Sequence, residues 1–301
     1  MAKEFDISIA IDKASYLNPQ IYMLIDTMKD KLPDDTIVHV TTNRSRKEQV
    51  IKYIKDNVPT KIYIKPKTSN LISRCRYLMN AVDVKTEADY LVRMDVDMLA
   101  LKHLDWITEQ TKHGYDIVIQ GENRRIIKDD MIELRIWRHI YRAMGIKMPD
   151  YKIHFIENHE EGRPLFNTGF MIIKSDILPT IRERWKPLTK ICEKWIQLGI
   201  HSNEFAMTGL IMDEGWNWGT ISGEEVFNPI SHYRKGEFPS TELVDDCVLP
   251  DDVEMLHWHH SHWIQHIARF NPNIRNIIQR NDKYIPKEWW KRDSFKEQQE
   301  E

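Results

Sequence analysis

The chain has 301 residues and a formal net charge of −3, and 41% of its residues are apolar. This length suits one large α/β domain with an appendage, and the composition excludes a wholly disordered chain. The net charge does not mark a dedicated polyanion binder. Cys75, Cys192 and Cys247 have no spacing typical of a disulfide framework or a metal site, which favours a reducing, cytoplasmic location. No stretch approaches the roughly 18 apolar residues that a membrane span needs, so we expect none. The sequence leaves the oligomeric state open.

Strand-like and helix-like segments alternate through the first half of the chain. We expect strands at 5–12, 36–42, 61–64 and 90–94, and helices after Pro19, at 44–57 and at 70–84. This order is typical of βαβ units, so the sequence predicts a Rossmann-like α/β fold with a mostly parallel sheet flanked by helices. There is no Gly-x-Gly-x-x-Gly turn and no Walker-type Gly-Lys-Ser/Thr sequence, which argues against dinucleotide binding and ATP hydrolysis.

Two aspartates follow the apolar strand at 90–94. Asp95 and Asp97 are separated by one residue at the carboxyl end of this strand, which is where open α/β sheets bind their ligands. Carboxylate oxygens at this spacing suit Mg²⁺ or Mn²⁺, and such an ion can hold a diphosphate. A turn or a helix cap is the alternative interpretation of any Asp-x-Asp sequence.

A basic, aromatic segment occupies 124–147, after a further expected strand at 115–120. Helical spacing puts Arg135, Arg138 and Arg142 on one face of this segment. An ordinary solvated helix and a site for an anionic acceptor or nucleic acid both fit the pattern.

The segment 163–174 is the second informative stretch. Residues 170–173 have the pattern of a strand, and we expect Asn167-Thr-Gly169 to form a tight polar turn at its start. Glycine in such a turn allows a ligand to approach the backbone closely, although a plain hairpin turn has the same composition.

Met94-Asp-Val-Asp-Met98, followed later by Phe166-Asn-Thr-Gly-Phe-Met-Ile-Ile-Lys174, resembles the nucleotide-sugar-dependent glycosyltransferases of the GT-A fold. Within that fold the chain is most similar to the glycogenin- and galactosyltransferase-like retaining group. The resemblance covers about 5–263. It implies a GT-A-like domain at 1–270 and a short helical and polar C-terminal tail at 271–301.

The resemblance also implies ligands for a divalent cation, Mn²⁺ or Mg²⁺. Asp97 would coordinate the ion that bridges the donor diphosphate, Asp95 would contact the ion or the ribose, and His257 would be the third ligand. A UDP-sugar is the favoured donor. The other residues that would contact it lie in three parts of the chain: Ala10, Asp12, Arg74, Arg76, Asn167 and Gly169.

A polar pair opens a later helix in the resembling group, next to the anomeric carbon of the donor sugar. Asn203 and Glu204 are the similar positions here, where the group usually has Asp-Gln, and they are the candidate catalytic side chains. The histidines near His257 leave a zinc site open, because His262 and His266 have helical i, i+4 spacing.

The stretches 215–219 and 222–227 have the composition of a loop region rich in glycine and tryptophan. Trp216 is a candidate acceptor-sugar platform together with Arg135 and Arg138, since an indole face stacks on a pyranose, although buried tryptophans are commoner in cores.

The sequence therefore predicts a cytoplasmic, metal-dependent hexosyl- or pentosyltransferase of the retaining type. A glycan or a lipid-linked carbohydrate is the favoured acceptor, and hydroxylated bases of DNA come second. A zinc hydrolase and a non-catalytic nucleotide-sugar-binding protein are the alternatives from other classes.

Overall fold

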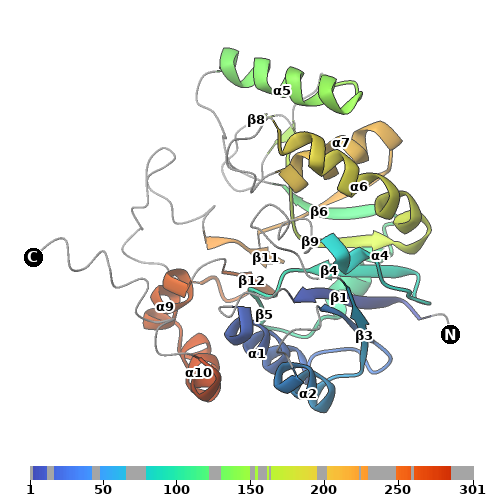
Figure 1. Ribbon diagram of the computed structural model, residues 1–301. Helices are drawn as coiled ribbons and strands as arrows, with labels where there is room; N and C mark the ends of the chain where they lie inside the picture. The colour runs from blue at the N-terminus through green and yellow to red at the C-terminus, as the bar shows by residue number, and fades with distance from the viewer. Residues whose placement is uncertain are drawn as a thin grey trace, which may run out of the picture.

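The computed structural model describes residues 3–11, 17–42, 48–65, 79–121, 130–149, 153–154, 161–162, 164–194, 202–223, 225–229, 249–258 and 261–285. Its centre is a seven-stranded sheet in the order β10-β6-β9-β4-β1-β2-β3 (Figure 1). The strands of the chain are β1 (Phe5–Ile11), β2 (Val38–Thr42), β3 (Thr60–Ile64), β4 (Tyr90–Met94), β5 (Met98–Ala100), β6 (Ile117–Gly121), β7 (Ile153–His154), β8 (Glu161–Gly162), β9 (Phe166–Lys174), β10 (Trp218–Ile221), β11 (Val226–Phe227) and β12 (Met255–His257). The prediction of a mostly parallel α/β sheet is confirmed, because only β9 runs antiparallel to its neighbours β4 and β6 in this sheet.

Helices cover both faces of the sheet. They are α1 (Leu17–Met28), α2 (Glu48–Asn57), α4 (Asp105–Thr111), α5 (Asp130–Met144), α6 (Leu178–Cys192), α7 (Ser202–Glu214), α9 (Ser261–Phe270) and α10 (Pro272–Asn281), with the short 3-10 helices η1 (Met79–Val82), η2 (Ser175–Ile177) and η3 (Asp282–Tyr284). Among the described helices, none is both long and apolar enough to cross a membrane.

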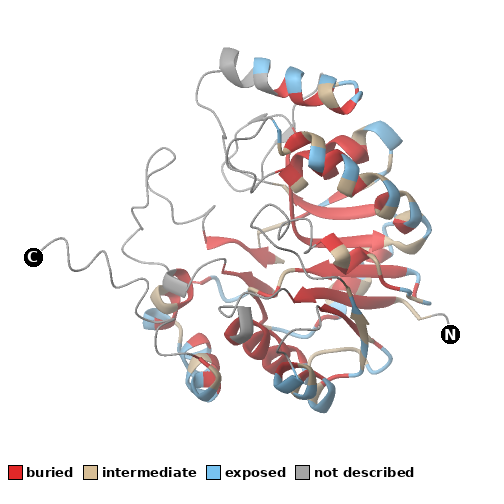
Figure 2. Ribbon diagram, in the orientation of Figure 1, coloured by how far each residue is buried: buried red, intermediate tan, exposed pale blue. Residues whose placement is uncertain are grey.

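Side chains alternate between the two faces of the sheet along each strand, and the buried ones form two main clusters, one on each face. On β4, Val92 and Met94 join the cluster beneath α1, α2 and α4, whereas Leu91 joins the cluster beneath α5, α6 and α7. Buried residues therefore follow the sheet and the helix faces turned towards it (Figure 2). Strands buried on both faces explain the unbroken apolar sequence of β4.

A second, three-stranded sheet has the order β11-β12-β5. In it β12 pairs antiparallel with β5, and His257 lies opposite Met98. Its apolar residues pack with Met23 of α1 and with Ile264 and Ile274 of α9 and α10 in a third buried cluster. The predicted tail at 271–301 is thus helical where it is described, and its first helix packs on the domain. The division at residue 270 stays a prediction.

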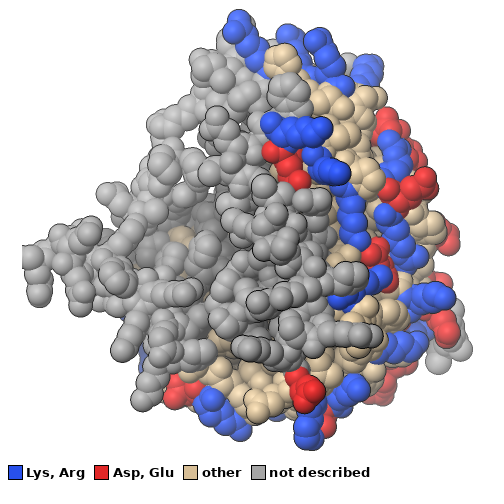
Figure 3. Space-filling model, viewed as in Figure 1, with Lys and Arg blue, Asp and Glu red and all other residues tan. Residues whose placement is uncertain are grey.

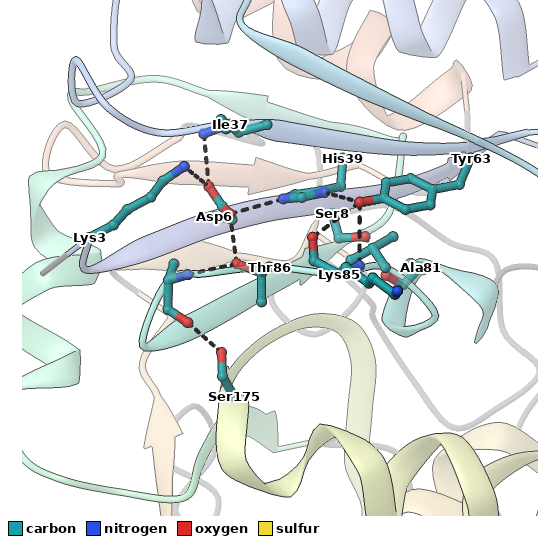
Figure 4. Close-up of polar contacts among 12 residues, drawn as sticks. Lys3, Asp6, Ser8, Ile37, His39, Tyr63, Ala81, Lys85, Thr86 and Ser175 are labelled. Atoms are coloured by element: carbon teal, nitrogen blue, oxygen red, sulfur yellow. Dashed lines mark hydrogen bonds and ion pairs between the residues drawn. The ribbon is translucent and has the colours of Figure 1, made fainter.

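A buried polar network ties β1 to its neighbours at the opposite end from the aspartates (Figure 4). The carboxylate of Asp6 accepts hydrogen bonds from the amide of Ile37 at 2.9 Å and from Thr86 Oγ1 at 2.6 Å, and pairs with His39 Nε2 at 2.9 Å. The other ring nitrogen of His39 lies 3.0 Å from the hydroxyl of Tyr63 on β3. These contacts fix the register of β1, β2 and β3.

One sequence prediction of local structure is wrong, and a second is right only in part. Asn167-Thr-Gly169 is not a turn before a strand, because β9 begins at Phe166 and the segment continues it. Instead of a turn, the Asn-Thr-Gly sequence forms a bulge in β9. The pairing of β6 with β9 jumps here from Ile119–Met171 to Gln120–Asn167.

The prediction of a loop region at 215–219 and 222–227 is right only in part. Residues 215–217, 222–223 and 225 lie outside the strands, whereas Trp218 and Gly219 belong to β10, which pairs parallel to β6 at the edge of the large sheet, and Val226 and Phe227 form β11 of the small sheet. Gly219 suits a strand here because a Cβ atom at this position would lie 2.7 Å from the ring of Tyr115, so glycine lets the two segments pack closely.

Candidate functional site

The two motifs meet where β4 ends. Met94 of β4 pairs with Phe170 of β9, and the amide of Asp95 donates a hydrogen bond to the carbonyl of Gly169 at 2.7 Å. The chain leaves β4 at Asp95 and re-enters a strand at Met98, so Asp97 lies in the short connection between the two sheets.

Pairing of β5 with β12 brings a histidine to this connection. His257 lies opposite Met98, and the amide of Trp258 donates to the carbonyl of Asp97 at 3.1 Å. Nε2 of His257 lies 3.4 Å from Oδ1 of Asp97. The histidine ring is buried, with 2% of the side chain exposed, while the side chain of Asp97 is 18% exposed.

Asp95, Asp97 and His257 form a group that fits a divalent cation. One ligand atom from each lies within 4.8 Å of the other two. Two ligand atoms on opposite sides of a six-coordinate Mg²⁺ are about 4.2 Å apart, so the spacing of the three ligand atoms is close to the one that a bound ion requires. Two carboxylates and one imidazole make an oxygen-rich set that suits Mn²⁺ or Mg²⁺ better than a structural zinc site, which is dominated by Cys and His.

Burial and neighbouring charges shift the pKa values of Asp95 and His257. Burial raises the pKa of Asp95, and the nearby Asp97 carboxylate raises it further, against the lowering effect of the Arg93 guanidinium. Burial alone would lower the pKa of His257, but the Asp97 and Asp95 carboxylates raise it overall. A cation bound between the two carboxylates would favour the charged form of both.

Gly169 leaves space for the histidine ring. A Cβ atom at Gly169 would overlap Cε1 of His257 and would lie 2.8 Å from Oδ1 of Asn167. That oxygen accepts a hydrogen bond from the Gly169 amide at 2.7 Å, so the Asn167 side chain supports the bulge of β9. Asn167 and Gly169 thus lie beside the aspartates.

The first turn of α7 brings Asn203 next to the bulge. Nδ2 of Asn203 donates to Oγ1 of Thr168 at 2.6 Å, and its backbone carbonyl accepts from Nε1 of Trp185 at 2.9 Å. Glu204 is buried, and its carbonyl accepts a hydrogen bond from Thr208 at 2.8 Å, within α7. The described contacts join Asn203, through Thr168, to the bulge of β9 that lies beside the aspartates.

Two further residues of the site were not found from the sequence. Arg93 is buried on β4 and donates to Oδ1 of Asp95 at 2.6 Å and to the carbonyl of Thr168. The available signal was a charged residue inside an otherwise apolar strand, two positions before Asp95, which requires a nearby partner. Thr168 had no such signal of its own.

The other predicted site residues lie in several places. Ala10 is buried on β1, paired with Thr41, and Asp12, Arg74 and Arg76 lie outside the described residues. Arg135 and Arg138 are exposed on α5, and Trp216 is half-buried beside the apolar cluster under α7. No contact among the described residues connects these three with the aspartates, and their acceptor role stays a prediction.

Comparisons with known proteins reveal the fold of the chain. No protein-family model and no curated protein sequence matches it. Two solved structures of the galactosyltransferase LgtC, one in complex with donor and acceptor sugar analogues and one of an active-site mutant, match 95% of this chain and 98% of their own. Their TM-scores are 0.53 and 0.56, at 12% identity. The chain has the GT-A glycosyltransferase fold.

A third GT-A structure is that of the bifunctional glycosyltransferase WbbM, which matches 93% of this chain but only 51% of its own, with a TM-score of 0.50 and 11% identity. At these identities the likeness concerns the fold. It confirms the GT-A architecture expected from the paired motifs.

Proposed function

We propose that the chain is a metal-dependent glycosyltransferase that moves a sugar from a nucleoside-diphosphate sugar to a hydroxyl acceptor. The observation that carries this proposal is the group of Asp95, Asp97 and His257 at the carboxyl end of β4, the central strand of a GT-A sheet. LgtC, which shares the fold, is a galactosyltransferase solved with donor and acceptor sugar analogues. A UDP-sugar is the favoured donor.

The chain's own residues would bind and orient the donor. Asp97 and His257 would hold Mn²⁺ or Mg²⁺, and Asp95 would contact the ion or the ribose. Asn167 and Gly169 would face the donor sugar from the bulge of β9. When bound, the cation supplies positive charge where the departing diphosphate gains negative charge.

Asn203 and Glu204 are the proposed catalytic side chains beside the anomeric carbon. The hydrogen bond from Asn203 Nδ2 to Thr168 leaves Oδ1 of this amide, a buried atom with no hydrogen-bond partner in the described part of the chain, free to accept from a sugar hydroxyl. An amide is a poor base, which supports retention of the anomeric configuration. If Glu204 acts instead as a general base, the product is inverted. NMR of the anomeric proton of the product distinguishes the two outcomes.

The acceptor site is proposed to include the exposed face of α5. Arg135, Arg138 and Arg142 are exposed on this helix, while Trp137 and Tyr141 pack inward. Lys and Arg side chains gather over α5 at the top of the view in Figure 3. A glycan or a lipid-linked carbohydrate carrying negative charge suits this face. The net charge of −3 supports a duplex DNA acceptor less well.

The alternatives from other classes have less support. A zinc hydrolase would require a nitrogen-rich ligand set, and the metal-ligand group found in the described residues contains one histidine and two aspartates. A cytoplasmic location is retained as a proposal from the cysteine content.

A screen of nucleotide sugars for thermal stabilisation tests the proposed function. A donor that binds the folded protein at 100 times its dissociation constant adds about 2.7 kcal/mol to the free energy of unfolding. We expect one class of nucleotide sugar to raise the melting temperature only when Mn²⁺ or Mg²⁺ is present. No stabilisation by any nucleotide sugar with either ion would contradict the proposal.

A further inference from the structure

Arg93 is a cation in the interior of the large sheet. It lies on β4, and its side chain is 2% exposed. Side chains alternate along a strand, so Arg93 points to the same face as Leu91, the face covered by α7. A buried guanidinium is costly unless acceptors satisfy it.

Two acceptors from different motifs engage its terminal nitrogens, while Nε has no hydrogen-bond partner in the described part of the chain. One terminal nitrogen of Arg93 donates to Oδ1 of Asp95 at 2.6 Å, and the other donates to the carbonyl of Thr168. A guanidinium is planar and permanently charged, so its two terminal nitrogens hold both acceptors in one plane. With Oδ1 engaged in this way, the side chain of Asp95 cannot rotate without breaking the contact.

We propose that Arg93 is a positioning residue for the metal site, which rests on the proposed metal-dependent function. It holds Oδ1 of Asp95, so that the carboxylate offers its second oxygen towards Asp97 and His257. Because Arg93 also donates a hydrogen bond to the Thr168 carbonyl, it fixes the distance between the Asp95 carboxylate and the bulge of β9.

The contact also extends towards the proposed catalytic pair. Thr168 accepts from Arg93 at its carbonyl and from Asn203 at its hydroxyl, the latter at 2.6 Å. A continuous path of hydrogen bonds therefore joins Asp95, Arg93, Thr168 and Asn203. Arg93 positions the cation ligand and the side chain near the anomeric carbon relative to each other.

Arg93→Lys tests this role, because lysine keeps the charge but cannot hold two acceptors in one plane. Mn²⁺ affinity is measured by titration without any donor, alongside the melting temperature of the metal-free protein. We expect Mn²⁺ binding to weaken by about 10–100-fold, the range typical when a residue that orients a metal ligand is changed. Arg182→Lys is the matched control, because Arg182 also bridges two carbonyls, those of Val82 and Val84, at 2.7 and 2.5 Å.

A double-mutant cycle separates positioning from a purely structural role. If Arg93 acts on the metal through Asp95, Arg93→Lys has no further effect on Mn²⁺ affinity in an Asp95→Asn background. If Arg93→Lys does not fold, Arg93→Gln takes its place in the same cycle.

Three results would overturn the proposal. They are unchanged Mn²⁺ affinity in Arg93→Lys, an equal loss in Arg182→Lys, and additive effects in the cycle. Asp97→Asn distinguishes this failure from failure of the proposed function. If Asp97→Asn abolishes Mn²⁺ binding and Arg93→Lys does not weaken it, only the role of Arg93 is wrong. If the wild-type protein binds neither Mn²⁺ nor Mg²⁺, both proposals are wrong.

Discussion

The amide of Asp95 and the carbonyl of Gly169 share a hydrogen bond of 2.7 Å, although the two residues belong to different motifs. This bond extends the pairing of β4 with β9 beyond the last strand residue of β4. It places the first aspartate beside the bulge that, by our proposal, faces the donor sugar. A change on either side of this bond is therefore expected to affect both metal binding and donor binding.

His257 is expected to bind the cation directly. His257→Gln should weaken Mn²⁺ affinity by more than the ~10–100-fold typical of residues that only orient a ligand. Titration of the metal-free protein measures this, and His266→Gln on α9 is the control that should leave affinity unchanged. Equal losses in the two variants would place the metal site elsewhere in the histidine-rich segment.

Gly169→Ala is expected to disturb the site by overlap. The added Cβ atom would collide with Cε1 of His257, and the strained packing should cost about 1–3 kcal/mol of stability. Mn²⁺ affinity should fall with it, because the ring must move. In Gly209→Ala the new methyl meets Cε of Met144 at 2.8 Å, the flexible end of a side chain, so a small effect is expected. Melting curves with and without Mn²⁺ compare the two, and equal behaviour would contradict the contact with His257.

The basic face of α5 is expected to bind an anionic acceptor. Arg138→Ala should raise the acceptor Michaelis constant by about tenfold, equivalent to the loss of one charge-assisted hydrogen bond of ~1.5 kcal/mol. Donor hydrolysis should not change, and Lys52→Ala on the exposed side of α2 is the control. Acceptor binding should depend only weakly on salt, whereas duplex DNA would give a steep log-linear dependence. Unaltered acceptor kinetics in Arg138→Ala would remove α5 from the acceptor site.

Asp6 is expected to make stability depend on acid pH. Burial alone would raise the pKa of Asp6, but hydrogen bonds from His39, Lys3, Thr86 and the amide of Ile37 lower it well below its ordinary value. A carboxyl group whose pKa is lower in the folded state stabilises the fold above its unfolded pKa of about 3.9. That contribution is lost as the pH falls below this value.

Asp6→Asn measures this contribution. The variant should lose about 3 kcal/mol at neutral pH, because His39 and Lys3 lose their charged partner. Its deficit relative to the wild-type protein should shrink as the pH is lowered below about 4. Denaturant unfolding from pH 7 to pH 3 provides the test. A deficit that stays constant across this range would contradict the role assigned to the carboxylate.

The sequence predicted the structure well where an apolar pattern and a group of polar side chains point to the same place. An apolar run that ends in Asp95 and Asp97 predicts a buried strand with polar groups at its carboxyl end, and the structure contains that strand. The alternation of strands and helices predicted the parallel sheet. The relation of His257 to Asp97 required the resemblance, because five histidines lie between 257 and 266 and their spacing alone favours none of them.

The sequence was misleading where long-range packing determines local structure. Asn and Gly are turn residues by propensity, yet the pairing of β9 with β4 and β6 keeps Asn167 and Gly169 inside a strand. Gly219 belongs to a strand because the ring of Tyr115 packs against it, a contact between distant parts of the chain. The hydrogen bond from Arg93 to the Thr168 carbonyl could not be predicted either, because the two residues are far apart in the sequence.

The central claim is that a divalent cation held by Asp97 is required for turnover of a nucleotide sugar. The direct measurement is release of nucleoside diphosphate from the donor found in the stabilisation screen, by the wild-type protein and by Asp97→Asn, with Mn²⁺ and with excess chelator. We predict turnover only for the wild-type protein with metal, and an Asp97→Asn variant that folds normally and is inactive, because Asp97 lies in a connection outside the strands. Full activity in excess chelator, or in Asp97→Asn, would contradict the account.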